Sequence, residues 1–557
     1  MDVTIFCLAR LAIPIVVSAC SLTALRAQNP GGPAGLPPLI VPLQNPITQA
    51  KAALGKILFW DEQLSANNTV ACGTCHQPSS GGGDSRRSTN PGLDGLLGTA
   101  DDTFASPGMR RSDINNEYFP AVAFGLSPQV TKRTSPSFLL AAWFSELLYD
   151  GAPGQQLIDP LTGLVVIPAG AALESQALLP ILKFDEMGHD GRGWPEVTGK
   201  LAACTPLALA TALPPDVAAA IAVNPTYPGL FTQAFGDAAI TPVRIAMALA
   251  TYERTLVADQ TPWDAFARGQ QNALTQNQIA GMNLFNGTAR CNLCHVPGLF
   301  TDTQFRNLGI RPIAEDNGRQ GVSGNVADRG KFKMPSLRNV GLRAEVFHPG
   351  GLTSLTLILA FYVAGGGTNL DNKDSLLQPV VLSQQQRNQL IDFLSNGLTD
   401  PRVAAEQAPF DRPSLWSERN LIGNPLFAFG TPGTGGIVPG MLAEVPANVG
   451  NVDFKVGVTN ALGGTFAMLS IALQRAPVGT QINGIPVLTN VGGVAIFIHT
   501  ALGGQPGVAG DGYGTVRFPI PNAPFLAGLT VFGEWFVWDS AGVGGAAKSR
   551  GVTLPIF

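Results

Sequence analysis

The chain has 557 residues, which is long enough for several domains with real hydrophobic cores, so the fold does not depend on disulfides. Charged residues make up only 13% of the chain, and the 65 glycines and 44 prolines predict many turns and long loops. The formal net charge is −4 and Lys and Arg do not cluster, which argues against nucleic-acid binding. No run of about 18 apolar residues occurs beyond the extreme N-terminus, so we expect no transmembrane helix.

The first 27 residues have the features of an export signal. Arg10 precedes an apolar stretch from Leu11 to Ala19, and Leu25-Arg26-Ala27 offers a peptidase site. A competing interpretation is a bacterial lipoprotein signal in which Cys20 carries a lipid anchor. Both interpretations predict an exported protein, in the periplasm or the cell envelope of a bacterium.

Helical patterns dominate the next 400 residues. A linker at 28–45, rich in Pro and Gly, leads into apolar residues at helical spacing over 46–58. Residues 77–131 are rich in Gly and Asp and are expected to form a long surface loop. Thr241 and Pro242 mark the start of a helix, as its N-cap and first residue. Ser383 with Gln386 forms the capping box of another helix.

Near residue 423 the pattern changes to short alternating runs separated by Gly and Pro turns, which predicts an antiparallel β-sandwich over residues 423–557. The clearest runs are Thr465 to Leu473, Val494 to His499 and Leu529 to Trp538. Phe536 and Trp538 would share one face of a strand, and we expect them to be core residues rather than a platform for sugars. We also expect His499 to be a core residue.

Two copies of one short motif account for four of the seven cysteines: Cys72-Gly-Thr-Cys75-His76 and Cys291-Asn-Leu-Cys294-His295. Both have the form C-x-x-C-H, which is the attachment pattern of c-type haem. Two thiols one helical turn apart reach the two vinyl groups of one porphyrin, and the adjacent His lies under the iron as its ligand. The motifs therefore predict two covalently bound haem c groups, with His76 and His295 as iron ligands. The alternatives are a zinc site, which would give the two histidines no role, and a redox dithiol.

Around these motifs, residues 46–422 resemble the bacterial di-haem cytochrome c peroxidases and their relative MauG. The family's segment before the first haem is matched by Leu54-Gly-Lys-Ile-Leu-Phe-Trp-Asp61. The helix before the second haem is matched by Tyr252-Glu-Arg-Thr-Leu-Val257, and the segment after the second haem by Phe332-Lys-Met-Pro-Ser-Leu-Arg-Asn-Val340. The resemblance implies a mainly α fold of two cytochrome-c-like domains ahead of the all-β sandwich. Residues 46–270 would hold the peroxidatic haem and residues 271–422 the electron-transfer haem.

The stretch from Leu173 to Met187 resembles the family's pocket above the first haem. By that match Gln176, Pro180 and Glu186 face this haem. Cleavage of the O–O bond of hydrogen peroxide needs a base that takes a proton from one oxygen and an acid that returns it to the other. Glu186 is the candidate for both roles, with Gln176 orienting the peroxide. A surface Glu on a helix is the plainer alternative.

The chain departs from the usual peroxidase pattern at two places near the first haem. Tyr149-Asp150-Gly151 stands where the family has a Trp-Asp-Gly motif, so Tyr149 is the candidate for electron transfer between the haems. In the usual peroxidases a loop His covers the first iron until activation, but no His lies between residues 77 and 134 here. The resemblance therefore implies a first haem that is open to peroxide without reductive activation, as in MauG, with His189 as an alternative distal group.

The second haem needs a sixth ligand. Fourteen residues past the position of His348, the peroxidases have a Met and MauG has a Tyr, and this chain has Tyr362. A phenolate favours ferric iron, so ligation by Tyr362 would give this haem a low potential. The alternative is that Tyr362 is a core residue and Met334 is the ligand.

The family also holds a calcium ion between the haems through an Asn side chain and backbone carbonyls. The Asn position corresponds to Thr134, and the carbonyl positions fall near Arg343 and Glu345. Calcium is therefore a further candidate cofactor.

Together these residues predict an exported di-haem c peroxidase. It would reduce hydrogen peroxide at the first haem with electrons delivered through the second, from a small cytochrome c or copper protein. One alternative is a MauG-like oxidase that acts on a protein or organic substrate, which Tyr362 favours. Another is a non-catalytic electron-transfer or binding protein docked through its β region, against which Gln176 and Glu186 argue.

Overall fold

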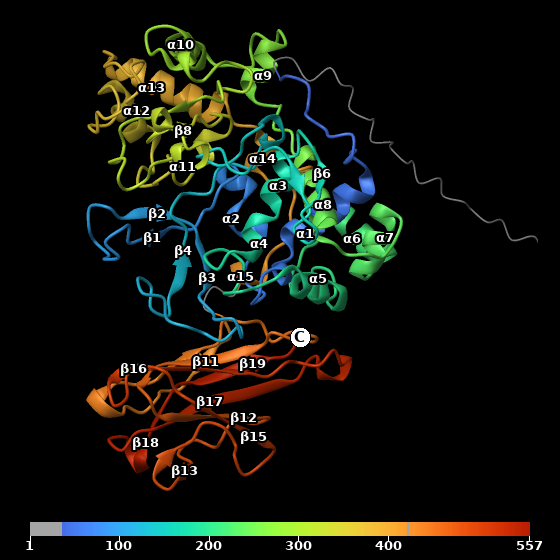
Figure 1. The fold of residues 1–557 in the computed structure, drawn as a ribbon, viewed down its shortest axis with the longest axis vertical. Coiled ribbons are helices and arrows are strands. Elements are labelled where there is room, and N and C mark those ends of the chain that lie inside the picture. Colours follow the sequence, from blue (N-terminus) through green and yellow to red (C-terminus); the bar gives the residue numbers. More distant parts are fainter. Residues whose placement is uncertain (1–35, 420–422) are drawn as a thin grey trace, which may run out of the picture.

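The computed structural model describes residues 36–419 and 423–557, so the predicted export and lipidation signals lie outside the described residues. A helical body, residues 36–419, forms one end of the molecule, and a sheet-rich region, residues 423–557, forms the other (Figure 1). We call the second region the β module. In the described part of the chain, no helix is both long enough and apolar enough to cross a bilayer.

Helices α1 to α15 are the main regular elements of the helical body, and several begin where the sequence predicts. Thr48 caps α1 by accepting a hydrogen bond from the Lys51 amide, and Thr241 caps α8 in the same way. The capping box of Ser383 and Gln386 opens α13. The helices are α1 Gln49–Trp60, α2 Cys72–Cys75, α3 Ala172–Ala177, α4 Leu179–Leu182, α5 Trp194–Ala203, α6 Pro215–Val223, α7 Tyr227–Phe235, α8 Pro242–Thr255, α9 Pro262–Ala267, α10 Gln276–Asn286, α11 Gln320–Ser323, α12 Leu355–Val363, α13 Gln384–Asp392, α14 Pro401–Ala404 and α15 Trp416–Arg419.

The main core of the helical body lies between α1 and α8. Leu54, Ile57 and Leu58 of α1 are completely buried, and each contributes about 1.5–3 kcal/mol of hydrophobic stabilisation. Gly55 lets the two helices touch, because a Cβ atom at this position would lie 1.9 Å from the carbonyl oxygen of Ala248. The first cysteine motif packs on the end of α1, because a Cβ atom at Gly73 would lie 2.1 Å from the Trp60 ring, so this core fixes the position of α2.

The helical body is mainly α, but it also contains four short two-stranded antiparallel sheets. The pairs are β1 Ser88–Asn90 with β2 Thr103–Ala105, β3 Pro107–Arg110 with β4 Pro128–Val130, β5 Leu157–Ile158 with β6 Val165–Ile167, and β7 Phe305–Arg306 with β8 Phe332–Lys333. Two of these pairs lie within residues 77–131, where Met109 and Tyr118 are almost completely buried. The expectation of a long surface loop agrees with residues 92–100, none of which is buried, but it is wrong for the segments around β3 and β4, which pack against the β module and line the first cavity.

Two antiparallel sheets of the β module share one core, as the alternating pattern predicts, and β13 and β14 form a separate two-stranded sheet. One sheet has the order β10-β11-β16, and the other β15-β12-β17-β19-β9 with β18 beside β17. Trp535 of β17 is fully buried between them and donates a hydrogen bond from its indole nitrogen to the carbonyl of Gly457. The strands are β9 Leu426–Phe427, β10 Gly440–Leu442, β11 Lys455–Leu462, β12 Phe466–Ala472, β13 Gln481–Ile482, β14 Ile485–Pro486, β15 Ala495–Ala501, β16 Ala509–Arg517, β17 Thr530–Trp538, β18 Ala546–Lys548 and β19 Gly551–Pro555.

Two expectations about the β module are wrong. Phe536 is buried, but Trp538, two residues along the same face of β17, is 46% exposed. His499 of β15 is also exposed, and its ring lies 5.8 Å from that of Trp538. Trp538 lies on the face of β17 opposite to Trp535 and Val537, which point into the core. His499 lies on the same outer face of the sheet, because His499 and Phe536 are both paired with Met468 of β12.

Candidate functional site

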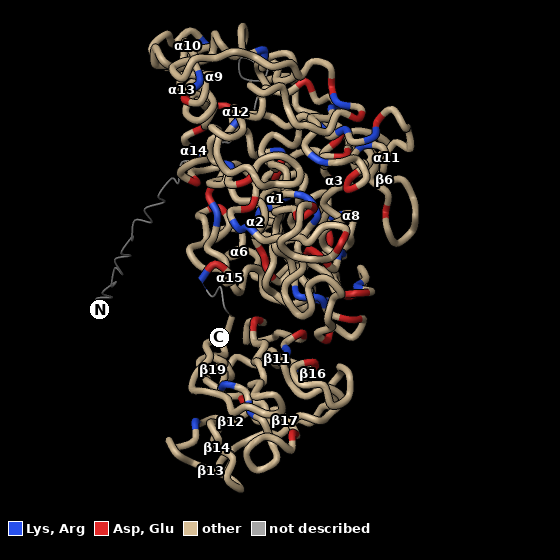
Figure 2. The backbone as a smooth tube through the Cα atoms, turned by 90° about the vertical axis from the view of Figure 1, so that its left-hand side faces the viewer, with Lys and Arg blue, Asp and Glu red and all other residues tan. Residues whose placement is uncertain are grey.

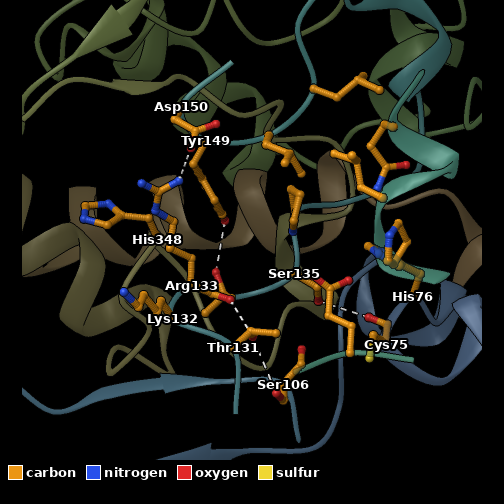
Figure 3. Close-up of a pocket in the computed structure, with 18 of the residues that line it drawn as sticks. Cys75, His76, Ser106, Thr131, Lys132, Arg133, Ser135, Tyr149, Asp150 and His348 are labelled. Carbon is orange, nitrogen blue, oxygen red and sulfur yellow. Dashed lines mark hydrogen bonds and ion pairs between the residues drawn. The ribbon is translucent and has the colours of Figure 1, made fainter. Parts of the chain in front are cut away.

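A cavity of about 780 Å³ lies beside the first cysteine motif. Cys72, Cys75 and His76 line it from α2 and the residue after it, and Tyr149 and His348 line its opposite side. Figure 3 shows His76 and Cys75 at one side of this space and Tyr149, Asp150 and His348 at the other. The cavity is large enough for a prosthetic group rather than a single ion.

The residues around the first motif fit a covalently bound haem. Nδ1 of His76 lies 3.3 Å from the carbonyl oxygen of Gly82, a contact of the kind that orients a metal-binding imidazole so that its Nε2 can serve as the ligand. Burial raises the pKa of the Cys72 thiol to about 12. Reactive dithiols have lowered thiol pKa values, so this site does not have the character of a redox dithiol.

A second cavity, of about 200 Å³, adjoins the second cysteine motif. Cys291, Cys294 and His295 line it, and Nδ1 of His295 lies 3.0 Å from the carbonyl oxygen of Phe300. The His295 ring is therefore oriented by a backbone carbonyl in the same way as that of His76. Tyr362 of α12 and Met334 line this cavity as well, so both candidate sixth ligands are within it.

The zinc interpretation of the cysteine motifs finds no support in the described residues. They contain no group of three or more His, Cys, Asp and Glu side chains arranged to hold a metal ion. Each motif supplies one His and two thiols beside a cavity, which is the donor set of a c-type haem rather than a four-ligand zinc site.

The three residues matched to the distal pocket all line the first cavity. Gln176 lies at the end of α3, Pro180 lies in α4, and Glu186 follows in the next loop. The carboxylate of Glu186 is 3.1 Å from Nζ of Lys183, and burial raises its pKa above the ordinary value. The structure therefore brings Gln176 and Glu186 into the same space as Cys72, Cys75 and His76.

Tyr149 lies between the two cavities and lines both. Its hydroxyl is 3.1 Å from Oγ1 of Thr134, and its ring meets that of His348 edge-on at 6.3 Å. Thr134 also donates a hydrogen bond to the carbonyl of Phe347. The hydroxyl group of Thr134 is thus already hydrogen-bonded within the protein. The calcium ion expected near Thr134 stays a prediction.

His189 does not face the first cavity. It is buried, its Nε2 lies 2.9 Å from a carboxylate oxygen of Glu196, and its Nδ1 lies 2.9 Å from the carbonyl oxygen of Asp190. Both ring nitrogens are therefore occupied, so the alternative of His189 as a distal group has no support in this geometry.

One acidic residue of the first cavity was missed by the sequence reasoning. Glu253 of α8 lines the cavity and is 7% exposed, and no described side chain bonds to its carboxyl group. Burial raises its pKa to about 8. The sequence does indicate that Glu253 is buried, because Glu253 follows Leu249 by four residues and so lies on the buried face of α8.

Comparisons with known proteins agree with this geometry. The model of the di-haem cytochrome c peroxidase family matches residues 49–272. The methylamine utilization protein MauG of Methylorubrum extorquens is 30% identical over 380 residues, which are 67% of this chain and 84% of MauG. This chain belongs to the di-haem cytochrome c peroxidase and MauG family. The resemblance inferred from the motifs is confirmed, and the chain is an oxidoreductase whose family membership implies two haem c cofactors.

Other members of the di-haem cytochrome c peroxidase and MauG family match a similar share of the chain. The cytochrome-c peroxidase IdrP1 of Pseudomonas sp. strain SCT is 28% identical over 444 residues, which are 73% of this chain and 96% of that protein. Among solved structures, a MauG-like protein associated with microbial copper homeostasis is 23% identical, with a TM-score of 0.49. It covers 69% of this chain and 98% of its own.

Proposed function

We propose that this protein is an exported di-haem c peroxidase that reduces hydrogen peroxide at the haem held by Cys72, Cys75 and His76. The observation that carries the proposal is the presence of Gln176, Pro180 and Glu186 in the cavity next to that motif. Residues 46–270 and 271–422 would form the two haem-binding domains. Export is supported by the signal-like pattern of the first 27 residues.

Glu186 would perform the proton chemistry, and Gln176 would orient the peroxide. When bound, the haem iron supplies the electron transfer that cleaves the peroxide bond. Reduction of one hydrogen peroxide to two waters consumes two electrons and two protons. Glu186 accepts a proton from one peroxide oxygen and delivers it to the other, while the free amide of Gln176 fixes the orientation of the peroxide. Burial raises the pKa of Glu186 above its ordinary value, which makes the carboxyl a better proton acceptor than an exposed one.

The electrons would come from a small cytochrome c or copper protein through the second haem, held by Cys291, Cys294 and His295. Tyr149 is the candidate relay, since it lines both cavities. Tyr362 is the candidate sixth ligand of the second haem. These assignments rest on position and on the family pattern.

Replacement of Glu186 by Gln tests the proposal. Glu186→Gln keeps the shape of the side chain but removes its acid–base function. We expect the reaction of the diferric protein with peroxide to slow by about 10²-fold or more, the usual scale of a positioned acid or base. Stopped-flow absorbance at the haem bands measures this rate, and an unchanged rate would remove Glu186 from the mechanism.

Two further measurements test the proposal as a whole. A pyridine haemochrome assay should find two haems per chain, and Cys72→Ala should lose one haem together with the reaction with peroxide. Steady-state peroxide consumption with reduced cytochrome c or a reduced copper protein should then be catalytic. One haem or none per chain would refute the central claim.

The second candidate function is a MauG-like oxidase of a protein or organic substrate. The presence of Tyr362 in the second cavity favours it, because a phenolate ligand disfavours the ferrous state that a peroxidase fed by soluble donors uses. Slow turnover with every donor protein, together with a low potential of the second haem, would favour this candidate.

A further inference from the structure

The segment from Pro107 to Tyr118 separates the β module from the first cavity, and we call it the bridging segment. It begins with β3, and Gly108 lines the first cavity. In Figure 1 the blue chain around β3 and β4 reaches down to the orange strands β11 and β16 of the β module. The bridging segment therefore touches the wall of the cavity on one side and the β module on the other.

On the cavity side, the bridging segment holds the backbone of the loop that carries Glu186. The Met109 amide donates to the Glu186 carbonyl at 3.2 Å, and the Asp190 amide donates to the Ser112 carbonyl at 3.0 Å. Arg111 adds an ion pair to the carboxylate of Asp190 at 3.0 Å. The two backbones touch, because a Cβ atom on Gly108 would lie 2.0 Å from the Asp185 carbonyl oxygen. Displacement of the bridging segment would therefore displace Glu186.

On the other side, one lysine of the β module holds the bridging segment. The ammonium group of Lys455, at the start of β11, donates to Ser112 Oγ at 2.8 Å, to the Asn116 carbonyl at 2.8 Å and to Asn116 Oδ1 at 2.7 Å. Lys455 is completely buried. All three of its donors are thus satisfied by this one segment, as a buried ammonium group requires.

Further contacts surround Lys455. Arg110 pairs with Glu444 of the β module at 3.0 Å, and the Tyr118 amide donates to Thr515 Oγ1 at 2.9 Å. Arg517 donates to the carbonyl of Asn115 at 2.8 Å. Figure 2 shows that charged residues are sparse in the β module, and three of them, Glu444, Lys455 and Arg517, lie at this contact.

We propose that the β module positions Glu186 for the peroxide reaction, with Lys455 as the positioning residue that fixes the bridging segment. This inference rests on the proposed function of Glu186. Proton transfer requires the carboxylate to stay within hydrogen-bond reach of the peroxide, and small displacements of a reacting group cost large factors in rate. The β module is therefore part of the peroxidatic site, although none of its residues lines the first cavity.

Replacement of Lys455 by Met tests this inference in the full-length holoenzyme, because Met has a similar reach but no donor. We expect the reaction of the diferric Lys455→Met protein with peroxide to slow by about tenfold. We also expect faster hydrogen exchange at the amides of Met109 and Asp190, measured by mass spectrometry. In a Glu186→Gln background the same substitution should have almost no effect on the rate, since residues that act as a unit are not additive.

Lys548→Met is the matched control. Lys548 is equally buried in the β module, but its partner is Glu534 of the same module, at 3.5 Å. This variant should react with peroxide at the wild-type rate. If Lys455→Met fails to fold, Thr515→Val replaces it, since it removes only the acceptor of the Tyr118 amide.

Three results would overturn the inference. The first is that Lys455→Met and Lys548→Met slow the reaction with peroxide equally. The second is that Lys455→Met slows this reaction as much in the Glu186→Gln background as in the wild type. The third is that neither Lys455→Met nor Thr515→Val changes the rate. The proposed function fails separately, if Glu186→Gln by itself leaves the rate unchanged.

Discussion

The carboxyl groups of Glu186 and Glu253 both line the first cavity, and their surroundings differ. Glu186 has the ammonium group of Lys183 3.1 Å away, whereas Glu253 has no partner among the described side chains. Burial in a poorly solvated site disfavours the charged form of a carboxyl group, and it raises the pKa of Glu253 to about 8. At neutral pH, Glu253 is therefore mostly protonated in the folded protein.

This difference predicts how stability depends on pH. Because the folded-state pKa of Glu253 lies above its ordinary value of 4.5, the folded state binds a proton that the unfolded state has lost between about pH 4.5 and pH 8. The free energy of unfolding therefore falls as pH rises through this window. We expect Glu253→Gln to gain stability relative to the wild type over the same window, by up to about 1.4 kcal/mol per pH unit.

Urea unfolding of the holoprotein at several pH values measures this difference. The gain of Glu253→Gln over the wild type should level off above about pH 8, where the carboxyl is ionised in both states. A difference that is constant from pH 5 to pH 8 would show that Glu253 does not titrate in this way.

The reduction potential of the second haem shows whether Tyr362 or Met334 is its sixth ligand. If the phenolate of Tyr362 binds the iron, it stabilises the ferric state, so Tyr362→Met should raise the potential. Each tenfold change in the equilibrium corresponds to about 59 mV for a one-electron couple. A redox titration followed by absorbance measures this shift.

The native spectrum provides the control. With Tyr362 as ligand, the ferric protein should lack the far-red charge-transfer band of His/Met ligation, and Met334→Leu should change neither spectrum nor potential. A His/Met band in the native protein that disappears in Met334→Leu would assign the ligand to Met334.

At the scale of elements, the parts that the sequence predicts well depend on local chemistry. The caps at Thr241 and Ser383 follow from hydrogen bonds within one turn, and the cysteine motifs are defined by spacing alone. The packing of residues 77–131 and the exposure of Trp538 depend on contacts with distant elements. The bridging segment is buried by strands some 340 residues later in the chain, at Lys455, and no local pattern encodes that contact.

The contact between α1 and α8 gives a prediction at this scale. Gly55→Ala would place a Cβ atom 1.9 Å from the carbonyl oxygen of Ala248, so the helices must separate. We expect a loss of about 1–3 kcal/mol in the free energy of unfolding. Gly199→Ala is the control, since α5 has open space at Gly199 and Ala is the better helix former. Chemical denaturation should show loss in the first variant and none in the second.

At the scale of the whole molecule, the two cavities meet at one wall. Tyr149, Lys333 and His348 line both of them, and the ring of His348 stacks on that of Phe332 at 3.5 Å. Nε2 of His348 has no hydrogen-bond partner in the described structure. The wall therefore includes aromatic rings and a buried lysine, beside Arg311 and Asp316, which also line both cavities. Under the proposed function, electrons moving between the haems would cross this wall at Tyr149.

The histidines of the first cavity predict how the enzyme is activated. Within the described residues, those that line it are His76, the proposed iron ligand, and His348, on the wall shared with the second cavity. The stretch between residues 77 and 134 contains no His that could cover the first iron. We therefore expect the diferric protein to react with peroxide as fast as the half-reduced protein, in stopped-flow mixing with and without one electron equivalent. A strict requirement for half-reduction would mean that another group caps the iron, and His189 could do so only by giving up its contacts with both Glu196 and Asp190.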